Sequence, residues 1–443
     1  MTESKIISLD NTKVDYAVSD QRMAGLIFLI VFKLSIEFEY YFVLKDLYYG
    51  STLMNFEYNF AKSCIGWFLI IVIYFCLEQT IRKPSDFFVT LYYYIVMVPL
   101  SIMYAFSNQN SYFFIVNCLL FMVIEIIVKS DIKKVDFSFN NLTNAMIISF
   151  YITTVIVYAD LFKEHGMFNF NALHIFSIYN MRGIFSLNKY IGYLFRIQFE
   201  IITPFFIVRS LKKREFIKCG FFIALQLVAY LYAAQKIILF SIPMIIVIYY
   251  FATKIKDWIN VVRLFIILTA VVVLLSSISR FFMLVSSLFI RRVLIIPAIL
   301  KFAYFEFFNY NIKTGFSGTL WGKLLGEVTP YPNGVGVTVG TEYFRLTGAN
   351  ENTGFVGEGY YMFGLLGIFL VYIVFICLLY IIDVLAIKNG NAFAITLSVF
   401  PIYLINDTGI ADRLMMGDLF VLVVICMCYS IEKDTIGINK KGK

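Results

Sequence analysis

Charged residues and histidine are scarce in this chain of 443 residues. Only 15% of its residues are Asp, Glu, Lys or Arg, whereas 60% are hydrophobic and the mean hydropathy is +0.80. A soluble domain with this balance would expose far too much apolar surface, so the composition indicates an integral membrane protein. The chain has only two histidines, which argues against a zinc or iron cluster. We therefore expect no metal ion and no cofactor.

Sequence signatures of nucleotide chemistry and of disulfides are also missing. There is no Walker-type phosphate loop, no GxSxG nucleophile elbow and no DxD-type constellation for a metal and a nucleotide sugar. Without a nucleotide site, the energy for any reaction has to arrive in the substrate. The seven cysteines all fall inside apolar runs and are expected to be small packing residues: Cys64, Cys76, Cys118, Cys219, Cys377, Cys426 and Cys428.

Long apolar runs dominate the chain instead. Because a membrane-spanning helix needs about 20 apolar residues, the runs predict an all-α integral membrane protein with about twelve transmembrane helices in a single domain, 1–443. The first 20 residues are polar and carry no cleavable signal pattern, so insertion is expected to begin with the first spanning helix. The predicted spans are 24–44, 61–79, 87–106, 111–128, 142–162, 191–208, 219–234, 236–252, 262–279, 359–386, 391–405 and 414–430.

Cation-rich and cation-poor segments alternate along this series of spans. Lys and Arg concentrate in cytoplasmic loops, so we place both termini in the cytoplasm. The net charge of +8 then reflects membrane orientation and indicates no nucleic-acid partner. The predicted cytoplasmic segments are 1–23, 80–86, 129–140, 209–218, 253–261, 387–390 and the C-terminal tail.

Two predicted external loops, 163–190 and 280–358, are far longer than connectors need to be. The second loop, between the ninth and tenth predicted helices, opens with a hydrophobic stretch that we expect to form a helix lying along the membrane or dipping into it. A glycine-rich region follows, since 13 of the 25 glycines lie from Gly315 to Gly367. The stretch Thr341–Gly367 joins a polar loop directly to an apolar helix, which suits a tight groove for a sugar at the membrane surface.

Arginines gather on the predicted external side, where short loops are usually poor in cations. A guanidinium group recognises phosphate through planar, bidentate hydrogen bonds, so this set fits a diphosphate held at the level of the lipid headgroups. For any single arginine, contact with ordinary anionic headgroups or a local ion pair is the simpler explanation, whereas the whole set favours a ligand. The arginines are Arg182, Arg196, Arg280, Arg291, Arg292, Arg345 and Arg413.

Two titratable residues are the candidates for general acid–base chemistry. Glu358 lies between glycines at the start of a predicted helix, and the His174 side chain is of a type that titrates near neutral pH. Each also has an ordinary structural explanation, which for Glu358 is a carboxylate that complements the helix dipole. The same external side also holds Glu306, Asp407 and Asp412.

Ionisable residues inside the predicted spans are functional candidates by default. Lys33 and Glu37 are four residues apart, as are Arg196 and Glu200, so intrahelical ion pairs account for them. Three carboxylates have no predicted partner: Glu125, Asp383 and Asp418.

Two short stretches resemble a known family of membrane enzymes. The sequence NTGFVGEGYYMFGLLG (352–367) leads into the tenth predicted span, and SIYNMRG (177–183) lies in the first long loop. Together with twelve spans and two long external loops, they resemble the Wzy polymerases, which join the repeat units of bacterial O-antigen, capsule and exopolysaccharide. The topological similarity covers nearly the whole chain, whereas the motif similarity covers only these two stretches, and similar loops occur in O-antigen ligases.

The resemblance implies a GT-C-like helical bundle in the bacterial cytoplasmic membrane and a metal-independent glycosyltransferase. Such an enzyme transfers an oligosaccharide from undecaprenyl diphosphate to another lipid-linked repeat unit at the outer face, and arginines stabilise the charge that develops on the diphosphate. A flippase and a chain-length regulator are the further partners implied. The candidate catalytic residues are Arg182, Arg345, Glu358 and His174, and the candidate substrate-binding residues are Tyr179, Asn180, Arg196, Arg280, Arg291, Arg292, Asn352 and Arg413.

Two alternatives stay open, and the role of each arginine is open as well, because the arginine-ten-residues-glycine repeats of some family members are not cleanly present. Tyr193 and Val356 stand where glycines would follow Arg182 and Arg345. An O-antigen ligase is less favoured because ligases typically place a histidine in the large external loop, and 280–358 has none. A lipid-linked oligosaccharide flippase, which is a transporter, is less favoured because the cations lie at one face and the two halves of the chain differ.

Overall fold

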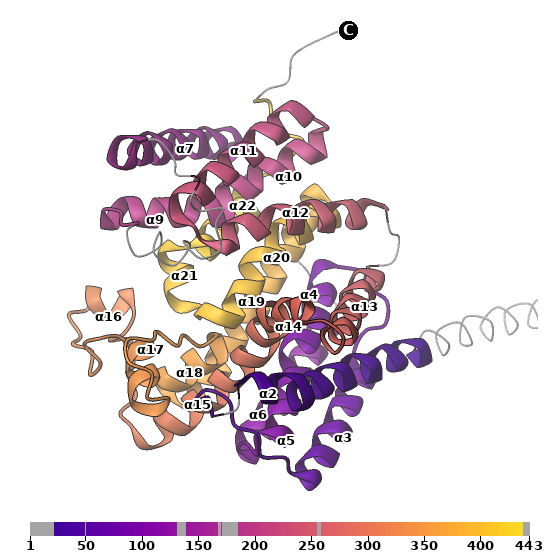
Figure 1. Cartoon of the computed structure of the whole chain (residues 1–443). Helices are drawn as coiled ribbons and strands as arrows, with labels where there is room; N and C mark the ends of the chain where they lie inside the picture. The colour runs from indigo at the N-terminus through magenta and orange to yellow at the C-terminus, as the bar shows by residue number, and fades with distance from the viewer. Residues whose placement is uncertain are drawn as a thin grey trace, which may run out of the picture.

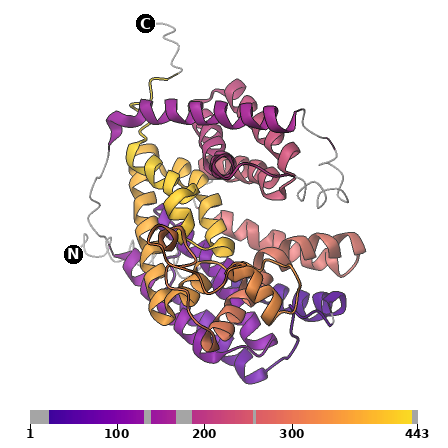
Figure 2. The same ribbon diagram turned by 90° about the vertical axis from the view of Figure 1, so that its left-hand side faces the viewer.

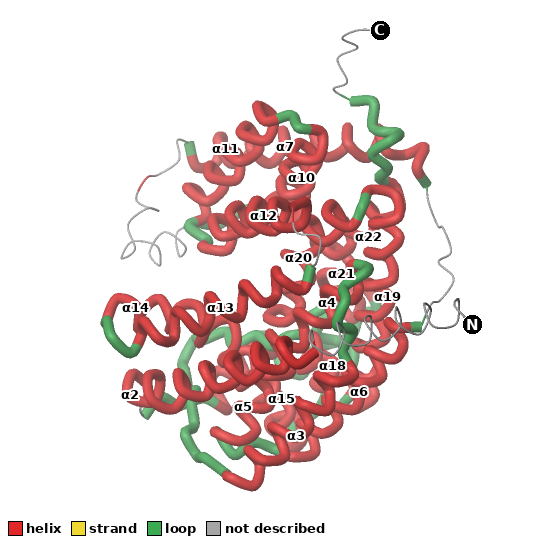
Figure 3. Tube along the Cα trace, turned by 90° about the vertical axis from the view of Figure 1, so that its right-hand side faces the viewer, coloured by secondary structure: helices red, strands yellow, loops and turns green. Residues whose placement is uncertain are grey.

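Helices form all of the regular structure that is described. The computed structural model describes residues 22–48, 50–130, 139–166, 170, 185–254 and 258–436. Every element in these residues is a helix and none is a strand (Figure 3). This confirms the predicted all-α class.

The helices follow one another along the chain as the colours of Figure 1 show. Residues 22–38 are helical and continue into the short elements η1 (Glu39–Leu44) and α2 (Lys45–Tyr48). The first half continues with α3 (Phe60–Cys76), α4 (Pro84–Tyr92), η2 (Tyr93–Met97), α5 (Val98–Phe106), α6 (Ser111–Lys129), η3 (Asn140–Leu142), α7 (Thr143–His165), α9 (Lys189–Ile197), η5 (Gln198–Ile202), α10 (Thr203–Lys213) and α11 (Phe216–Ala233). The second half contains α12 (Lys236–Lys254), α13 (Ile259–Ser276), α14 (Arg280–Ser286), η6 (Ser287–Ile295), α15 (Ile296–Tyr310), α16 (Leu320–Leu324), α17 (Val335–Thr338), η7 (Val339–Tyr343), α18 (Phe355–Phe363), α19 (Leu365–Asn389), α20 (Asn391–Thr408), α21 (Ala411–Met416) and α22 (Asp418–Cys428).

Nine helical runs in the described residues are long and apolar enough to cross a membrane. Eight of them match predicted spans, and the ninth, Arg280–Tyr310, falls where the sequence predicted an external helix. The predicted spans at α3 and α22 are apolar but shorter, with 17 and 11 residues. The membrane character of the chain is therefore supported, whereas the count of twelve spans stays a prediction.

A central group of aromatic side chains forms much of the main core. The continuous run Pro84–Phe106 is the most buried of the nine because other helices surround it on nearly all sides. Within it, Tyr92 contacts Phe121 of α6, Phe355 of α18 and Phe375 of α19, with ring centroids 5.4 to 5.8 Å apart. A smaller apolar cluster joins α7, α9, α11 and α12, which lie together in the upper part of Figure 1.

One end of the bundle collects the cationic segments, and we call it the basic end. The Tyr74 hydroxyl donates to Arg22 O at 2.8 Å, and Lys83 Nζ donates to Val128 O at 2.5 Å. These contacts bring together the beginnings and ends of helices that are far apart in the chain. The basic end comprises residues 22–25, 74–86, 128–130, 209–215, 383–391 and 426–436.

The C-terminal segment is tied to the same end. Asn391 Nδ2 donates to Arg82 O at 3.0 Å, and the Arg209 guanidinium forms hydrogen bonds of 2.6 and 2.8 Å with the Asp434 carboxylate. Burial alone would raise the pKa of Asp434, but hydrogen bonds from Arg209 and Lys213 hold it below its usual value. Described parts of five predicted cytoplasmic segments and of the C-terminal tail thus lie together, and which membrane face they occupy stays a prediction.

The opposite end carries the long irregular segment, and we call it the loop end. Asn59 N donates to Ala105 O at 2.8 Å, and the Phe305 ring contacts both Phe113 and Tyr360, with centroids 4.9 and 4.7 Å apart. The irregular segment 311–354 carries α16 and α17, which project on the left of Figure 1, and Figure 2 looks onto this side. The loop end comprises residues 39–59, 104–111, 276–287, 304–314, 343–363 and 406–413.

The helical run Arg280–Tyr310 begins and ends at the loop end. Next to its start, Ser276 donates to the Glu39 carboxylate at 2.8 Å, and Ser286 donates to the same carboxylate. Near its end, Phe305 packs against Tyr360. The run has 31 residues, which would suffice to cross a membrane, and the expectation that it lies along the membrane or dips into it stays a prediction.

Candidate functional site

Glu358 is buried in the first turn of α18 and is bonded to the chain that follows α20. Its Oε2 accepts hydrogen bonds from Ile410 N at 2.5 Å and from Ala411 N at 3.1 Å. Gly409, with φ of +74°, leaves room for this contact, because a Cβ there would lie 2.5 Å from Glu358 Oε1. Burial raises the pKa of Glu358 to about 7, against the lowering effect of the two backbone N–H groups. The carboxyl group therefore secures the 409–411 turn and titrates near neutral pH.

The glycine-rich motif packs directly on the end of α20. A Cβ on Gly354 would lie 2.1 Å from Asn406 O, so only glycine fits this approach. Asn406 also accepts hydrogen bonds from the ammonium group of Lys301. The Lys301 Nζ atom lies 2.7 Å from Asn406 Oδ1 and 3.3 Å from Asn406 O. Lys301 is fully buried and donates in addition to Pro297 O at 3.1 Å. Its charge is thus held among neutral oxygens of α15 and α20.

Arg413 is the centre of a buried ion network. The side chain is 1% exposed, and it donates to Thr408 Oγ1 at 2.8 Å and to the Asp418 carboxylate. The Glu200 carboxylate lies 3.9 Å away and also pairs at 3.2 Å with Arg196, whose side chain is 38% exposed. The network therefore extends from the buried Asp418 to the partly accessible Arg196, both of which the sequence had marked.

Asp407 is the accessible carboxylate beside this network. It is exposed and forms no hydrogen bond or ion pair with any residue in the described ranges. Burial by the surrounding chain raises the pKa of Asp407, and the positive charges of Lys301, Arg292 and Arg413 oppose this effect. We call these four residues the Asp407 cluster. Chemically, such a carboxylate can accept a proton from a bound hydroxyl, while the exposed Arg292 can contact an anion and the buried Lys301 and Arg413 add positive charge behind it.

Two adjacent arginines lie in the π-helical element η6. The Arg291 guanidinium lies 4.4 Å from the centroid of the Tyr48 ring and donates from Nε to Ser287 Oγ at 3.2 Å. Arg292 is exposed and faces the charge of Asp407. Because a π-helical turn is wider than an α-helical one, it changes the direction of the side chains that follow, and such turns are frequent at functional sites.

Three further predicted site residues are exposed and form no described bond with the Asp407 cluster. Arg345 is exposed, has a left-handed backbone with φ of +58° and pairs with no residue that the structure describes. Arg280 is exposed at the first residue of α14. Asn352 is exposed and approaches Gly336, where a Cβ would lie 2.8 Å from its Oδ1. The structure therefore brings Arg292, Arg413 and Arg196 toward one region and leaves Arg345 and Arg280 on the surface.

The candidates in the first long loop cannot be placed in the same way. His174, Tyr179, Asn180 and Arg182 lie outside the described residues, as does most of 163–190. Their proposed roles stay predictions.

A polar cavity of about 280 Å³ opens at the loop end. Tyr343 and Glu306 both line it, and the Tyr343 hydroxyl donates a hydrogen bond to the Glu306 carboxylate. Within the described residues, no group of three or more His, Cys, Asp or Glu side chains could hold a metal ion. The cavity is lined by Thr52, Leu53, Asn55, Glu57, Ser107, Asn108, Gln109, Ile299, Ala303, Glu306, Tyr343 and Phe344.

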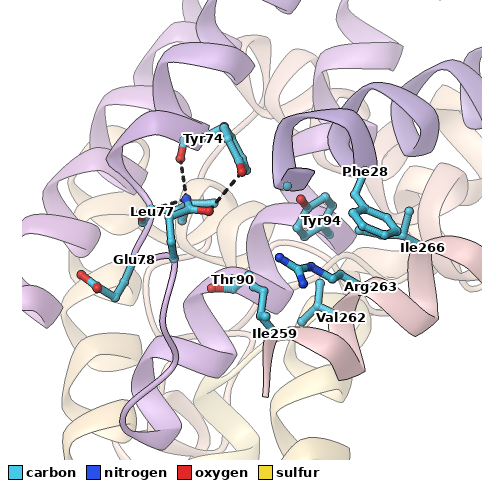
Figure 4. A pocket seen from close by; sticks show the side chains of 12 residues that line it. Phe28, Tyr74, Leu77, Glu78, Thr90, Tyr94, Ile259, Val262, Arg263 and Ile266 are labelled. Carbon is cyan, nitrogen blue, oxygen red and sulfur yellow. Dashed lines mark hydrogen bonds between the residues drawn. The ribbon is translucent and has the colours of Figure 1, made fainter. Parts of the chain in front are cut away.

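A much smaller cavity, of about 20 Å³, lies at the basic end. Figure 4 shows Arg263 reaching toward it beside Tyr94. The Tyr74 hydroxyl is hydrogen-bonded to Gln79 Oε1 at 3.0 Å. The Arg263 guanidinium carbon lies 5.5 Å from the centroid of the Phe28 ring. This volume holds about one water molecule, so the cavity is too small for a substrate.

Sequence reasoning missed Lys301 and gave Asp407 no role. A lysine within the apolar run PAILKFAYF was a visible signal, because a charge inside a hydrophobic helix is usually functional or paired. The run had been assigned to an external loop, so the lysine was not weighed. Asp407 was one of many external carboxylates, and only the fold shows that it is exposed and that the charges of three cations act on it.

The chain was compared with protein-family models, curated proteins and solved structures, and no match was found.

Proposed function

We propose that this protein is a metal-independent glycosyltransferase that polymerises lipid-linked oligosaccharide repeat units at the outer face of the bacterial cytoplasmic membrane. The resemblance of residues 352–367 and 177–183 to the Wzy polymerases supports the proposal. The observation that carries it is the accessible carboxylate of Asp407 among three cations. The glycine motif packs on Asn406, the residue immediately before this carboxylate.

In the proposed reaction, the cations of the Asp407 cluster attract the diphosphate of an undecaprenyl-diphosphate-linked donor. A hydroxyl of the acceptor sugar forms a new bond to the anomeric carbon of the donor as the bond to the diphosphate oxygen breaks. The diphosphate leaves with that electron pair, and Asp407 takes the proton of the hydroxyl and later releases it to water. The donor is already activated, so the reaction needs no ATP.

Other candidate residues have distinct roles in this proposal. Glu358 is a positioning residue, because its carboxyl group is bonded to Ile410 and Ala411, just beyond Asp407. Arg345 and Arg182 are proposed as further diphosphate contacts because they belong to the two loops that carry the resemblance.

Deletion of the gene, followed by gel analysis of glycans, tests the proposed function against its alternatives. A polymerase predicts that the mutant cell makes single capped repeat units. Free polymer that stays on its lipid carrier would instead identify a ligase, and repeat units trapped inside the cell would identify a flippase.

The first site prediction concerns Asp407. The variant Asp407→Asn keeps the shape of the side chain but loses the base, so polymer formation is expected to fall by about 100-fold or more while lipid-linked single units accumulate. The measurement is the rate of polymer formation by purified enzyme with lipid-linked repeat units.

Asp412 supplies a matched control in the same loop. Its Oδ1 accepts a hydrogen bond from Leu320 N at 2.9 Å, and it is exposed. Asp412→Asn should keep most of the activity, because an amide oxygen still accepts this bond. Full activity in Asp407→Asn would remove Asp407 from the reaction.

A further inference from the structure

The polar cavity at the loop end has a composition that suits hydroxyl groups. We infer that it binds one neutral sugar residue of the glycan. Its volume of about 280 Å³ is near the lower limit of about 300 Å³ for ligand pockets, so the occupant is a single ring rather than an oligosaccharide. The assignment of that sugar to the acceptor or product chain rests on the proposed function.

Several acceptors in the cavity are free to bind. Glu57 is exposed and has no hydrogen-bond or ion-pair partner among the described residues. Gln109 Oε1 is buried without a hydrogen bond in the described chain. Thr52 and Asn108 are exposed on the same lining and add a hydroxyl and an amide. A sugar ring, which presents several hydroxyls that both donate and accept, matches such a mixture.

The charge of the cavity excludes a phosphate. Glu57 and Glu306 both line it, and they would repel an anion. The ammonium group of Lys62, beside the cavity, donates to Asn108 O at 3.0 Å and to Gln109 O at 2.6 Å, so it holds the 107–109 loop. The diphosphate and the sugar therefore have separate places, the first at the Asp407 cluster and the second in this cavity.

The helix α15 separates these two places. Ile299, Ala303 and Glu306 line the cavity from one face, because residues at i, i+4 and i+7 lie on the same side of a helix. Lys301 follows Ile299 by two residues, or about 200° around the helix, and it reaches Asn406 on the other side.

One segment of the chain crosses α15 and touches both places. Tyr343 lines the cavity, and the next residues pass over the helix, where the Tyr304 hydroxyl donates to Glu351 O at 2.7 Å. The segment then reaches Asn406 at Gly354. A glycan with its reacting end at Asp407 would follow this path to place a later sugar in the cavity.

Binding can be measured without turnover by saturation-transfer NMR on the purified full chain in detergent. The probes are the methyl glycosides of glucose, galactose and N-acetylglucosamine, with methyl glucuronide and inorganic diphosphate as anionic comparisons. We expect transfer to at least one neutral glycoside. For that probe, Glu57→Gln should weaken binding about tenfold, because a hydrogen bond to a charged group is lost.

Two further variants keep the test decisive. Ala303→Leu fills the cavity and should abolish binding of the neutral glycoside, whereas Glu327→Gln, on the exposed part of the same external segment, should leave binding unchanged. If Ala303→Leu does not fold, Glu57→Gln decides. The inference is overturned if no neutral glycoside binds the unmodified protein, or if Glu57→Gln binds as well as Glu327→Gln.

The outcome can be separated from that of the proposed function. If a neutral glycoside binds in the cavity and the deletion strain still makes normal polymer, the sugar site is supported and the proposed polymerase function is wrong. Loss of polymer in the deletion strain, together with unchanged binding in Glu57→Gln, would reject the sugar site alone.

Discussion

The carboxyl group of Glu358 has a pKa of about 7 in the folded protein, raised by burial from its usual value of 4.5. Between these two values the folded protein holds a proton that the unfolded chain releases. The free energy of unfolding should therefore fall as the pH rises from about 4.5 to about 7, by up to about 3 kcal/mol. Glu358→Gln removes the titration but keeps an acceptor for Ile410 N and Ala411 N, so its stability should depend less on pH across this window. Thermal unfolding in detergent between pH 5 and pH 8 measures the difference.

Glu358→Ala is the control for this prediction. It removes the acceptor as well as the charge, so its melting temperature should be lower than that of Glu358→Gln at every pH. Identical pH profiles for the unmodified protein and Glu358→Gln would show that Glu358 does not titrate in this range.

Arginine geometry gives a second prediction at the scale of the residue. Arg292 is exposed and acts on Asp407, so Arg292→Ala should slow polymer formation by about 100-fold if the guanidinium binds the diphosphate. Arg292→Lys should restore only part of the rate, because an ammonium group cannot bind in bidentate fashion. Arg280→Ala changes another exposed arginine and is the matched control. An equal loss of polymer formation in Arg280→Ala would mean that Arg292 acts only through the general charge of the surface.

Residue pairs near in sequence were predictable, and distant pairs were not. The pairs Lys33–Glu37 and Arg196–Glu200 are confirmed, because helix geometry fixes the distance between residues four apart. Asp383, by contrast, accepts hydrogen bonds from Ser85 N and Oγ, 298 residues away. No local pattern specifies such a partner, and the same holds for the cations around Asp407.

At the scale of the element, α18 and α19 meet through glycine. A Cβ on Gly367 would lie 1.8 Å from Gly359 O, which is backbone and cannot move aside easily. Gly367→Ala should therefore lower stability by about 1–3 kcal/mol or prevent folding. Gly220→Ala is the control, because a Cβ at Gly220 in α11 would meet nothing within 4 Å and alanine favours a helix. Thermal unfolding in detergent compares them, and equal melting temperatures would contradict the predicted close approach.

Helix positions were largely predictable, because apolar runs of spanning length stand out in the sequence. The positions of the π-helical elements could not be predicted from the sequence. Glu39 lies in η1, Glu200 in η5 and Arg292 in η6, and each element widens a turn within an otherwise regular helical run. Tertiary contacts decide where a helix accommodates such a turn, so hydrophobic periodicity does not reveal it. Placing the charged side chains required the fold.

At the scale of the whole molecule, the two ends of the bundle should face opposite sides of the membrane. Val328 in the segment 311–354 is 90% exposed, and Ile217, at the start of α11 and two residues beyond the basic-end segment 209–215, is 92% exposed. In intact cells, a membrane-impermeant maleimide should label Val328→Cys, and it should label Ile217→Cys only after permeabilisation. The parent chain with its seven native cysteines is the control. The reverse pattern would place the loop end in the cytoplasm and exclude a reaction at the outer face.

The grouping of cationic segments at one end follows from the sequence, whereas the path of Arg280–Tyr310 does not. Length and hydropathy allow this run to cross the membrane. Ser286 near its start bonds to Glu39, and Phe305 near its end packs on Tyr360, so both parts of the run contact the loop end, while its path relative to the membrane stays a prediction. Glu39 precedes the run in the sequence and Tyr360 follows it. A window of local sequence therefore cannot show whether the run crosses the membrane or stays at the loop end.

The pairing of Lys301 also constrains how the protein is made. Within the described residues, the ammonium group is bonded to Pro297 O in its own helix and to two oxygens of Asn406, which is synthesised 105 residues later. Until α20 leaves the ribosome, the nascent chain lacks the Asn406 partner for this charge. The segment around Lys301 would therefore stay in contact with water at first and pack against α20 only late in biogenesis. A ribosome-stalled chain that ends before Asn406 would leave it undocked.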